Sequence, residues 1–245
     1  MPHNEVNLVL DSAKIMGTIK ALEKRIEDRF PSSSLLKTCK GFIQIADDSQ
    51  ENINYIGRPN LSIRIFALAI ILMGLVGIIY SFTLVNFKFS NLSFVDVVTL
   101  AEATINDLVL LGAAIFFLVT LEVRLKRNKA IKILDQLRGL AHVIDMHQLT
   151  KDPVMIGVIK LKTYNSPERS LSKFELQRYL DYCSEMLSLI GKVAALYSQS
   201  LPDDVIVRTV NEIESLTSGF SRKVWQKIMI LADIDGDAPL TVQMD

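Results

Sequence analysis

The stretch IFALAIILMGLVGIIYSFTLVNF, residues 65 to 87, carries no charged side chain. As an α-helix it would be about 34 Å long at ~1.5 Å per residue, enough to cross the roughly 30 Å hydrocarbon core of a bilayer. Its apolar residues surround the helix on every side, whereas a surface helix of a soluble protein confines them to one stripe. We therefore expect a transmembrane helix over 65–87. The alternative is a buried helical hairpin in a soluble protein.

A second apolar segment follows, but it is interrupted by acidic residues. Leu108 to Leu121 is uncharged, yet about 14 residues reach only ~21 Å as a helix. This segment crosses a membrane only if it extends over about 98–123 and takes Asp107 into the bilayer. The two segments would then form a transmembrane hairpin within residues 60–123, with Gly74, Gly77 and Gly112 serving helix packing.

The distribution of Lys and Arg predicts the orientation of this hairpin, because cytoplasmic flanks carry the excess of both. Arg58 and Arg64 precede the first segment, whereas the connecting loop holds only Lys88. Five basic residues follow the second segment, and we expect them to contact anionic lipid headgroups: Arg124, Lys126, Arg127, Lys129 and Lys132. Both termini are thus predicted to lie in the cytoplasm.

The composition excludes several classes of protein. The 245 residues are 49% hydrophobic and 22% charged, which is too apolar for an intrinsically disordered chain. Lys plus Arg equals Asp plus Glu at 27 each, so no net field attracts nucleic acid. Two cysteines cannot make a disulfide scaffold. We expect Cys39 and Cys183 to be reduced, buried residues of amphipathic helices.

Helical periodicity outside the apolar segments predicts an all-α fold. Residues 1–59 read as an antiparallel cytoplasmic helix pair, the first helix capped by Asn4 and the second starting after Ser32. Residues 124–233 read as a cytoplasmic bundle of long helices. Its predicted parts are a continuation of the second membrane helix to Leu149, a helix capped by Ser170 or Ser172 with Phe174 on its apolar face, and a last helix over 203–232. Residues 153–171 allow a short strand or a turn, and 234–245 form an acidic tail.

Three stretches of the C-terminal half carry a resemblance to known sequences. They are HVIDMHQLTKDP (142–153), YLDYCSEMLS (179–188) and SRKVWQKIMIL (221–231). Together they resemble a family of uncharacterised bacterial membrane proteins with two hydrophobic segments. The resemblance implies a protein of the bacterial inner (plasma) membrane. No activity is established for that family, so the resemblance assigns no residue a role.

Polar residues in the second apolar segment are one candidate site. An Asp at the centre of a membrane helix costs roughly 2.5–3.5 kcal/mol on insertion, so such residues usually face a cavity, a partner or an ion path. Glu102, Asn106 and Asp107 would then line a conduit, which a two-helix chain can build only as an oligomer. Alternatively, the carboxylates lie in the outer interface.

A second candidate lies where the long helix ends, around His142, Asp145 and His147. The first two share a helix face, whereas His147 lies about 140° around from His142, unlike the i, i+4 histidines of a zinc helix. We expect packing or interface histidines, with a positive charge on His147 favoured at the helix C-terminus. A metal or hydrolytic site, or a partner or ligand contact along Asp145–Asp152, is the alternative.

The remaining sequence offers no catalytic motif. Phosphate-binding, dinucleotide-binding, nucleophile-elbow and zinc motifs are absent, so we expect no metal and no cofactor. Trp225, the only Trp, is expected in the core, with an interface anchor as the alternative.

The leading functional hypothesis is a non-enzymatic protein of the bacterial inner membrane. It would be a scaffold or homo-oligomer whose cytoplasmic helices bind copies of the chain or a cytoplasmic protein partner. The first alternative is an oligomeric channel or ion-conducting effector that uses the intramembrane carboxylates. The second is a ligand sensor or metal-dependent enzyme at His142–Asp152.

Overall fold

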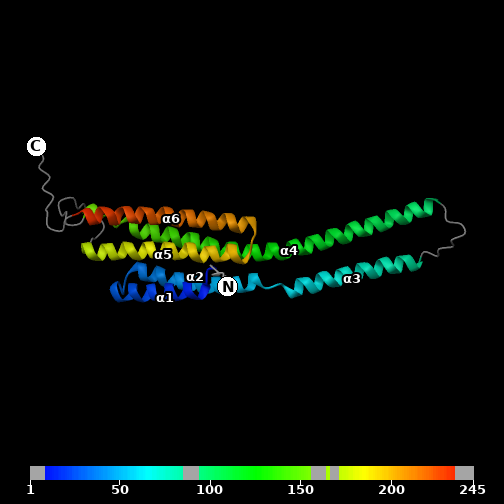
Figure 1. The fold of residues 1–245 in the computed structure, drawn as a ribbon, viewed down its shortest axis with the longest axis horizontal. Coiled ribbons are helices and arrows are strands. Elements are labelled where there is room, and N and C mark those ends of the chain that lie inside the picture. Colours follow the sequence, from blue (N-terminus) through cyan, green and yellow to red (C-terminus); the bar gives the residue numbers. More distant parts are fainter. Residues whose placement is uncertain (1–8, 85–93, 156–163, 166–170, 235–245) are drawn as a thin grey trace, which may run out of the picture. The chain divides into compact units, whose positions relative to one another are not determined.

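The computed structural model describes residues 9–84, 94–155, 164–165 and 171–234. In these ranges every regular element is helical, which confirms the predicted all-α class (Figure 1). The elements are α1 (Ser12–Arg29), α2 (Ser34–Gly57), α3 (Leu61–Leu84), α4 (Phe94–Leu149), the 3-10 turn η1 (Pro153–Met155), α5 (Lys173–Ser200) and α6 (Asp204–Asp233). Most of 153–171 and the tail from residue 235 lie outside the described residues.

The chain divides into two compact units. One comprises Met1–Ile56 and Lys129–Asp245, and the other comprises Gly57–Asn128. The first unit is a helical bundle of α1, α2, α5, α6 and the later residues of α4. The second contains α3 and the earlier residues of α4, so α4 contributes to both units.

Helices of the bundle bury side chains at helical spacing, along one stripe in α6 and over a broader face in α5, where adjacent residues such as Leu189 and Ile190 are both buried. In α6 the buried stripe recurs every three or four residues, as its sequence predicts, and comprises Ile206, Val210, Ile213, Thr217, Phe220, Val224, Ile228 and Leu231. In α5 the corresponding side chains include Leu180, Cys183 and Leu187, all fully buried. The short link between Ser200 and Asp204 makes these two helices antiparallel neighbours (Figure 1).

Polar side chains define where the bundle helices begin. Ser172 caps α5 in a capping box, since its hydroxyl accepts from the Glu175 N–H and the Glu175 carboxylate accepts from the Ser172 N–H. Asp203 is the N-cap of α6, where its carboxylate accepts from the N–H groups of Val205 and Ile206. The predicted first cap is wrong: α1 begins at Ser12 and is capped by Asp11, and Asn4 lies outside the described residues.

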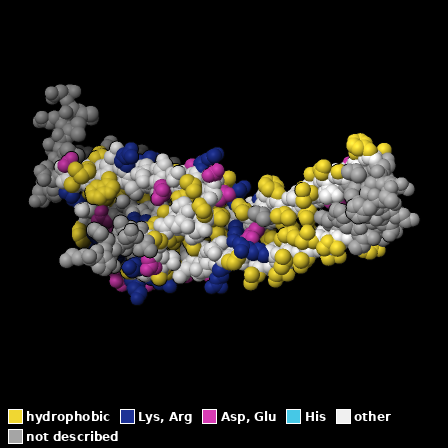
Figure 2. Space-filling view, turned by 45° about the vertical axis from the view of Figure 1, so that its right-hand side comes forward, with side chains coloured by type: hydrophobic (Ala, Val, Ile, Leu, Met, Phe, Trp, Pro, Cys, Tyr) yellow, Lys and Arg dark blue, Asp and Glu magenta, His cyan; other side chains and the backbone are white. Residues whose placement is uncertain are grey.

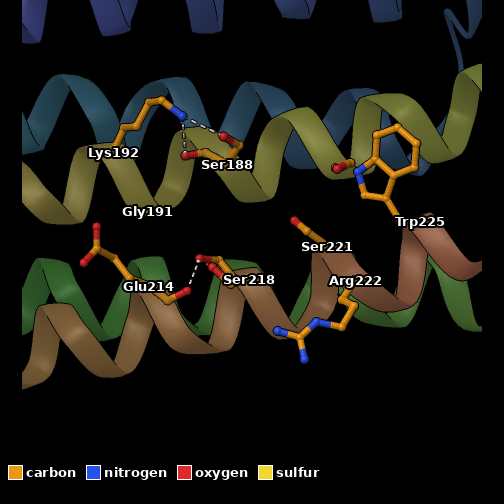
Figure 3. Close-up of a pocket in the computed structure, with 10 residues that line it drawn as sticks. Ser188, Gly191, Lys192, Glu214, Ser218, Ser221, Arg222 and Trp225 are labelled. Carbon is orange, nitrogen blue, oxygen red and sulfur yellow. Dashed lines mark hydrogen bonds between the residues drawn. The ribbon is translucent and has the colours of Figure 1, made fainter.

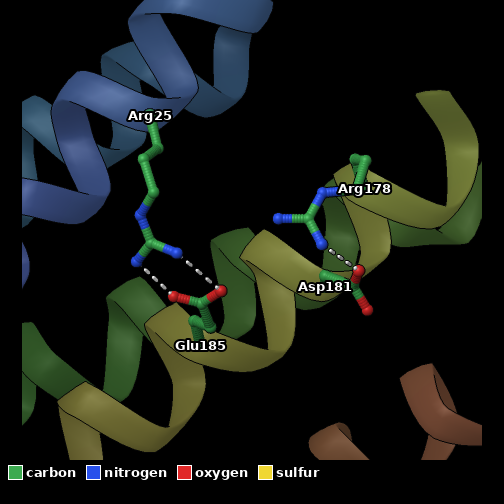
Figure 4. Close-up of polar contacts among 4 residues, drawn as sticks. All are labelled: Arg25, Arg178, Asp181 and Glu185. Atoms are coloured by element: carbon green, nitrogen blue, oxygen red, sulfur yellow. Dashed lines mark hydrogen bonds and ion pairs between the residues drawn. The ribbon is translucent and has the colours of Figure 1, made fainter.

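Charged contacts join α1 to both α2 and α5. Arg25 of α1 donates to both carboxylate oxygens of Glu185 on α5, at 2.6 and 3.3 Å, close to the Arg178–Asp181 pair within α5 (Figure 4). Lys40 of α2 pairs with Glu27 of α1 at 2.9 Å. These exposed pairs add orientation more than stability, because solvent screens them.

The later residues of α4 complete the bundle by packing on α6. Arg138 pairs with Glu212 at 2.8 Å. Farther along, the His142 ring lies edge-on to Phe220 with ring centroids 5.4 Å apart. The predicted continuation of the second apolar helix to Leu149 is confirmed.

In the second unit, apolar side chains lie on the surface. Two helical segments of the described residues are long and apolar enough to cross a membrane by length and composition, and almost none of their apolar residues are buried. Hydrophobic side chains accordingly cover much of this unit in the space-filling view (Figure 2). A Cβ added at Gly74 would lie 3.0 Å from Leu111, so α3 and α4 approach closely there; Gly77 and Gly112 meet no such neighbour.

Candidate functional site

A solvent-open groove of about 610 Å³ runs between α5 and α6 (Figure 3). Its volume lies within the roughly 300–1,000 Å³ typical of binding pockets, but its lining is more polar than most. Small hydroxyl and charged side chains dominate that lining: Ser184, Ser188, Gly191, Lys192, Glu214, Thr217, Ser218, Ser221, Arg222 and Trp225.

Small residues at helical spacing create the hollow. Ser184, Ser188 and Gly191 follow one another at steps of four and three, so they share one face of α5. A Cβ at Gly191 would lie 3.3 Å from the Thr217 hydroxyl, so α6 approaches α5 closely at this level. The short side chains leave the space above the contact open.

Charged side chains form the rims of the groove. Lys192, on the α5 rim, donates to the Ser188 hydroxyl at 2.6 Å (Figure 3). Glu214 and Arg222, on α6, are exposed and make no ion pair within the described residues. The groove therefore presents charges of both signs that the bundle itself does not neutralise.

Trp225 lies at one end of the groove, and its predicted place in the core is wrong. The buried stripe of α6 passes through Val224, and the next residue on a helix points about 100° away. The indole is accordingly 57% exposed. Phe174, also expected on an apolar face, is 59% exposed and lies under the Arg29 guanidinium.

The two histidines at the end of α4 contact different helices and form no common site. His147 hydrogen-bonds to Thr38 of α2 at 2.9 Å and lies 3.3 Å from the Ser34 hydroxyl. Burial, followed by the nearby Lys151 ammonium, lowers the pKa of His147. Both causes oppose the positive charge that the helix C-terminus was predicted to favour on His147.

The Asp145–Asp152 segment closes the end of α4. Asp145 accepts from the Gln148 side chain at 2.7 Å, and Asp152 accepts from the Val154 N–H at 3.1 Å. Lys227 of α6 donates to the Gln148 carbonyl at 2.5 Å, and burial lowers the pKa of that lysine. No group of three metal-ligating side chains occurs among the described residues. These contacts hold the last turn of the helix.

The other predicted site residues lie apart from the groove. In the second unit, the side chains of Glu102, Asn106 and Asp107 are exposed on α4. Lys126 pairs there with Glu122 at 2.9 Å, and in the bundle Lys129 lies 3.7 Å above the Tyr55 ring. Arg124 and Lys132 are exposed, and Arg127 is half-buried.

Both cysteines are buried, as predicted. Burial raises the pKa of each thiol, Cys39 and Cys183, to about 12. Thiolate is the reactive form, so neither side chain is a nucleophile at neutral pH.

No protein-family model, no curated protein and no solved structure matches the chain. The resemblance of the three C-terminal stretches to bacterial membrane proteins therefore stays a prediction.

The sequence reasoning missed the groove, although its signal was present. Serines and glycine at i, i+4 and i+7 on α5 face Thr217, Ser218 and Ser221 on α6. Small residues on two adjacent helices indicate either close packing or a hollow between the helices. The three-dimensional structure is needed to decide between these two alternatives.

Proposed function

We propose that this chain is an integral membrane protein in which an apolar hairpin anchors a non-enzymatic helical scaffold in the bacterial cytoplasm. The bundle would bind other copies or a protein partner. The hairpin consists of α3 and the apolar part of α4, and both termini lie on the cytoplasmic side.

The exposed apolar surface of α3 carries this proposal. Large side chains point outward all round the helix, including Phe66, Leu72 and Met73, which are 54–72% exposed. Soluble monomers rarely expose contiguous apolar patches of more than a few hundred Å². A lipid environment removes the cost of this surface, because both helices satisfy their own backbone hydrogen bonds.

Membrane integration is tested by extraction. Membranes from expressing cells are washed with alkaline carbonate and then with detergent. We expect the chain to stay in the pellet after carbonate and to be released only by detergent. Release by carbonate would refute the anchored hairpin.

Orientation is tested with single introduced cysteines, since both native thiols are buried. An impermeant maleimide should label Asn91→Cys, which lies between the two apolar segments in the sequence, from outside the cell. Thr150→Cys, exposed after α4, should react only after the membrane is permeabilised. The reverse pattern would place the bundle outside.

A non-enzymatic role is supported by the chemistry of the bundle. Its thiols are buried and its histidines contact separate helices. Among the described residues, the side chain that hydrogen-bonds a groove hydroxyl is Lys192, and it donates to Ser188 rather than accepting its proton. Nucleophilic catalysis requires a base within hydrogen-bond reach of the nucleophile. Surfaces of this kind suit binding.

One observation favours a channel as the second candidate. Glu102, Asn106 and Asp107 are exposed on a stretch of α4 that is otherwise apolar, and polar groups at membrane depth commonly face an ion path. Asp107→Asn should then change single-channel conductance in planar bilayers without changing the mass of the assembly. Unaltered conductance, or none in either protein, would exclude this role.

A further inference from the structure

We propose that the groove between α5 and α6 is the surface through which two copies of this chain pair, about a two-fold axis parallel to the two helices. The inference rests on the proposed scaffold function and names the surface that would assemble it. The groove of one copy would contact the same groove of a second copy.

The arrangement of charge across the groove carries this inference. Lys192 lies on the α5 rim and Glu214 on the α6 rim. Lys192 directly follows Gly191, and a Cβ added at Gly191 would lie 3.9 Å from Glu214 Cγ. Lys192 and Glu214 therefore lie at about the same height along the two helices. Neither side chain has an ion pair within the described residues. Each groove thus has a cationic rim and an anionic rim at one height.

A two-fold axis along the groove makes this pattern self-complementary. Rotation by 180° places the α5 rim of one copy opposite the α6 rim of the other and preserves height along the helices. Lys192 of each copy then faces Glu214 of the other, which gives two equivalent ion pairs. The same rotation sets Ser184 and Ser188 opposite Thr217 and Ser221, and these short side chains let the rims of the two copies approach closely.

The single Trp lies where such a contact would cover it. Trp225 is 57% exposed at the end of the groove. Aromatic residues are enriched at protein interfaces and charged side chains at their rims. The indole therefore provides an intrinsic fluorescence signal for pairing.

A different symmetry is conceivable on this surface and makes a different prediction. A two-fold axis across α6 at Ser218 would place Glu214 against Arg222 of the second copy, because these residues lie four positions on either side of Ser218. That arrangement does not use Lys192 and leaves the hydroxyls of α5 without a matching surface. The axis parallel to the helices uses both rims and both helices.

The first test is a charge swap in the full-length chain in nanodiscs or detergent, with the dissociation constant measured by analytical ultracentrifugation. Lys192→Glu and Glu214→Lys should each weaken pairing by roughly 10-fold, because each creates two like-charge contacts. The double variant should return to within about 3-fold of the wild type. Arg208→Glu is the matched control, since it reverses an exposed charge of α6 outside the groove and should leave pairing unchanged.

The second test uses disulfide cross-linking, for which both native cysteines are buried. Chains with Ser188→Cys and chains with Ser221→Cys carry different tags and are mixed before oxidation. The proposed axis predicts disulfides between differently tagged chains. Strong cross-linking of Ser218→Cys to itself would instead indicate the axis across α6 and overturn the proposal.

The outcomes separate this inference from the proposed function. A wild-type chain that resists carbonate extraction but stays monomeric at all concentrations refutes the pairing and leaves the anchor intact. The pairing proposal is also refuted if the double variant with Lys192→Glu and Glu214→Lys does not regain the affinity that the single variants lose. Circular dichroism of each variant shows whether the bundle is folded, and Trp225 emission should shift to the blue as pairing proceeds.

Discussion

Helices α3 and α6 are both long and uninterrupted, yet they place their apolar side chains in opposite ways. In α6 the buried residues recur at three- and four-residue steps and are mostly apolar, while the exposed positions between them are mostly polar, with Trp225 and Met229 among the exceptions. In α3 none of the described side chains is buried, although the helix is far more apolar. A periodic stripe indicates a protein neighbour, and a helix that is apolar all round indicates a lipid one.

The largest expected effect comes from truncating one leucine in each region. Leu187 in α5 is fully buried, so Leu187→Ala should lower the free energy of unfolding by about 2–5 kcal/mol through lost contacts and a cavity. Leu72→Ala in α3, where the side chain is 54% exposed, should lower it by much less. Guanidinium unfolding of the bundle in detergent measures both. Equal effects would remove the distinction between the two helices.

Charge insertion tests the same distinction from the lipid side. Leu72→Arg should reduce the fraction of chain that resists carbonate extraction, since a central Arg costs roughly 2.5–3.5 kcal/mol on insertion. Met146→Arg, at a side chain 65% exposed in the bundle portion of α4, is the matched control and should leave extraction unchanged. A loss of membrane retention in the control instead would place the lipid contact on the bundle.

Removal of a helix cap tests whether Ser172 stabilises the start of α5 in the bundle. Ser172→Ala deletes the hydroxyl that accepts from the Glu175 N–H, and should lower the free energy of unfolding by about 1 kcal/mol. Ser215→Ala, at an exposed position inside α6, should change it little. Thermal or denaturant unfolding compares the two variants, and a larger loss at Ser215 would contradict the assigned cap.

The smallest expected effect is a pH dependence confined to the bundle. Burial lowers the pKa of His147 below its usual 6.5, so the unfolded chain binds more protons in acid than the folded one. The corresponding stability is present above about pH 6.5 and is lost as the pH falls through the folded-state pKa. The unfolding free energy should therefore fall less between pH 7.5 and 5.5 in His147→Gln than in the wild type. An identical pH dependence in both proteins would show that His147 does not titrate on unfolding.

Much of the bundle could be predicted from the sequence because its determinants are local. The stripe of α6 and the predicted cap Ser172 are specified within a few residues, and the structure has both. The predicted start of α1 is wrong because Asn and Asp are both residue types that cap helices, so residue type alone does not choose between Asn4 and Asp11. The long helix α4 was predicted to Leu149 because no proline lies between the second apolar segment and Pro153.

The candidate site was less predictable because it depends on contacts between distant segments. Its place in the last turn of α4 predicts a charged side chain for His147, but the ring is half-buried against Thr38, more than a hundred residues away in sequence. Residue type predicts a core position for Trp225, yet the residue lies one position beyond the buried Val224. Residue chemistry suggested both roles, whereas the position of each side chain on its helix decided them.

The ammonium of Lys227 donates to the Gln148 carbonyl, one of the acceptors that a helix leaves open at its C-terminal end. The last turn of α4 is thereby closed by a side chain from α6 as well as by the Lys151 N–H, which donates to the same carbonyl at 3.1 Å. Free helix ends fray and exchange their amide hydrogens rapidly, whereas a turn held by another helix opens only when that helix separates. Amides near Gln148 should therefore exchange with deuterium at the slow rate of α6, and Lys227→Met should raise their rate without affecting the amides in the middle of α4.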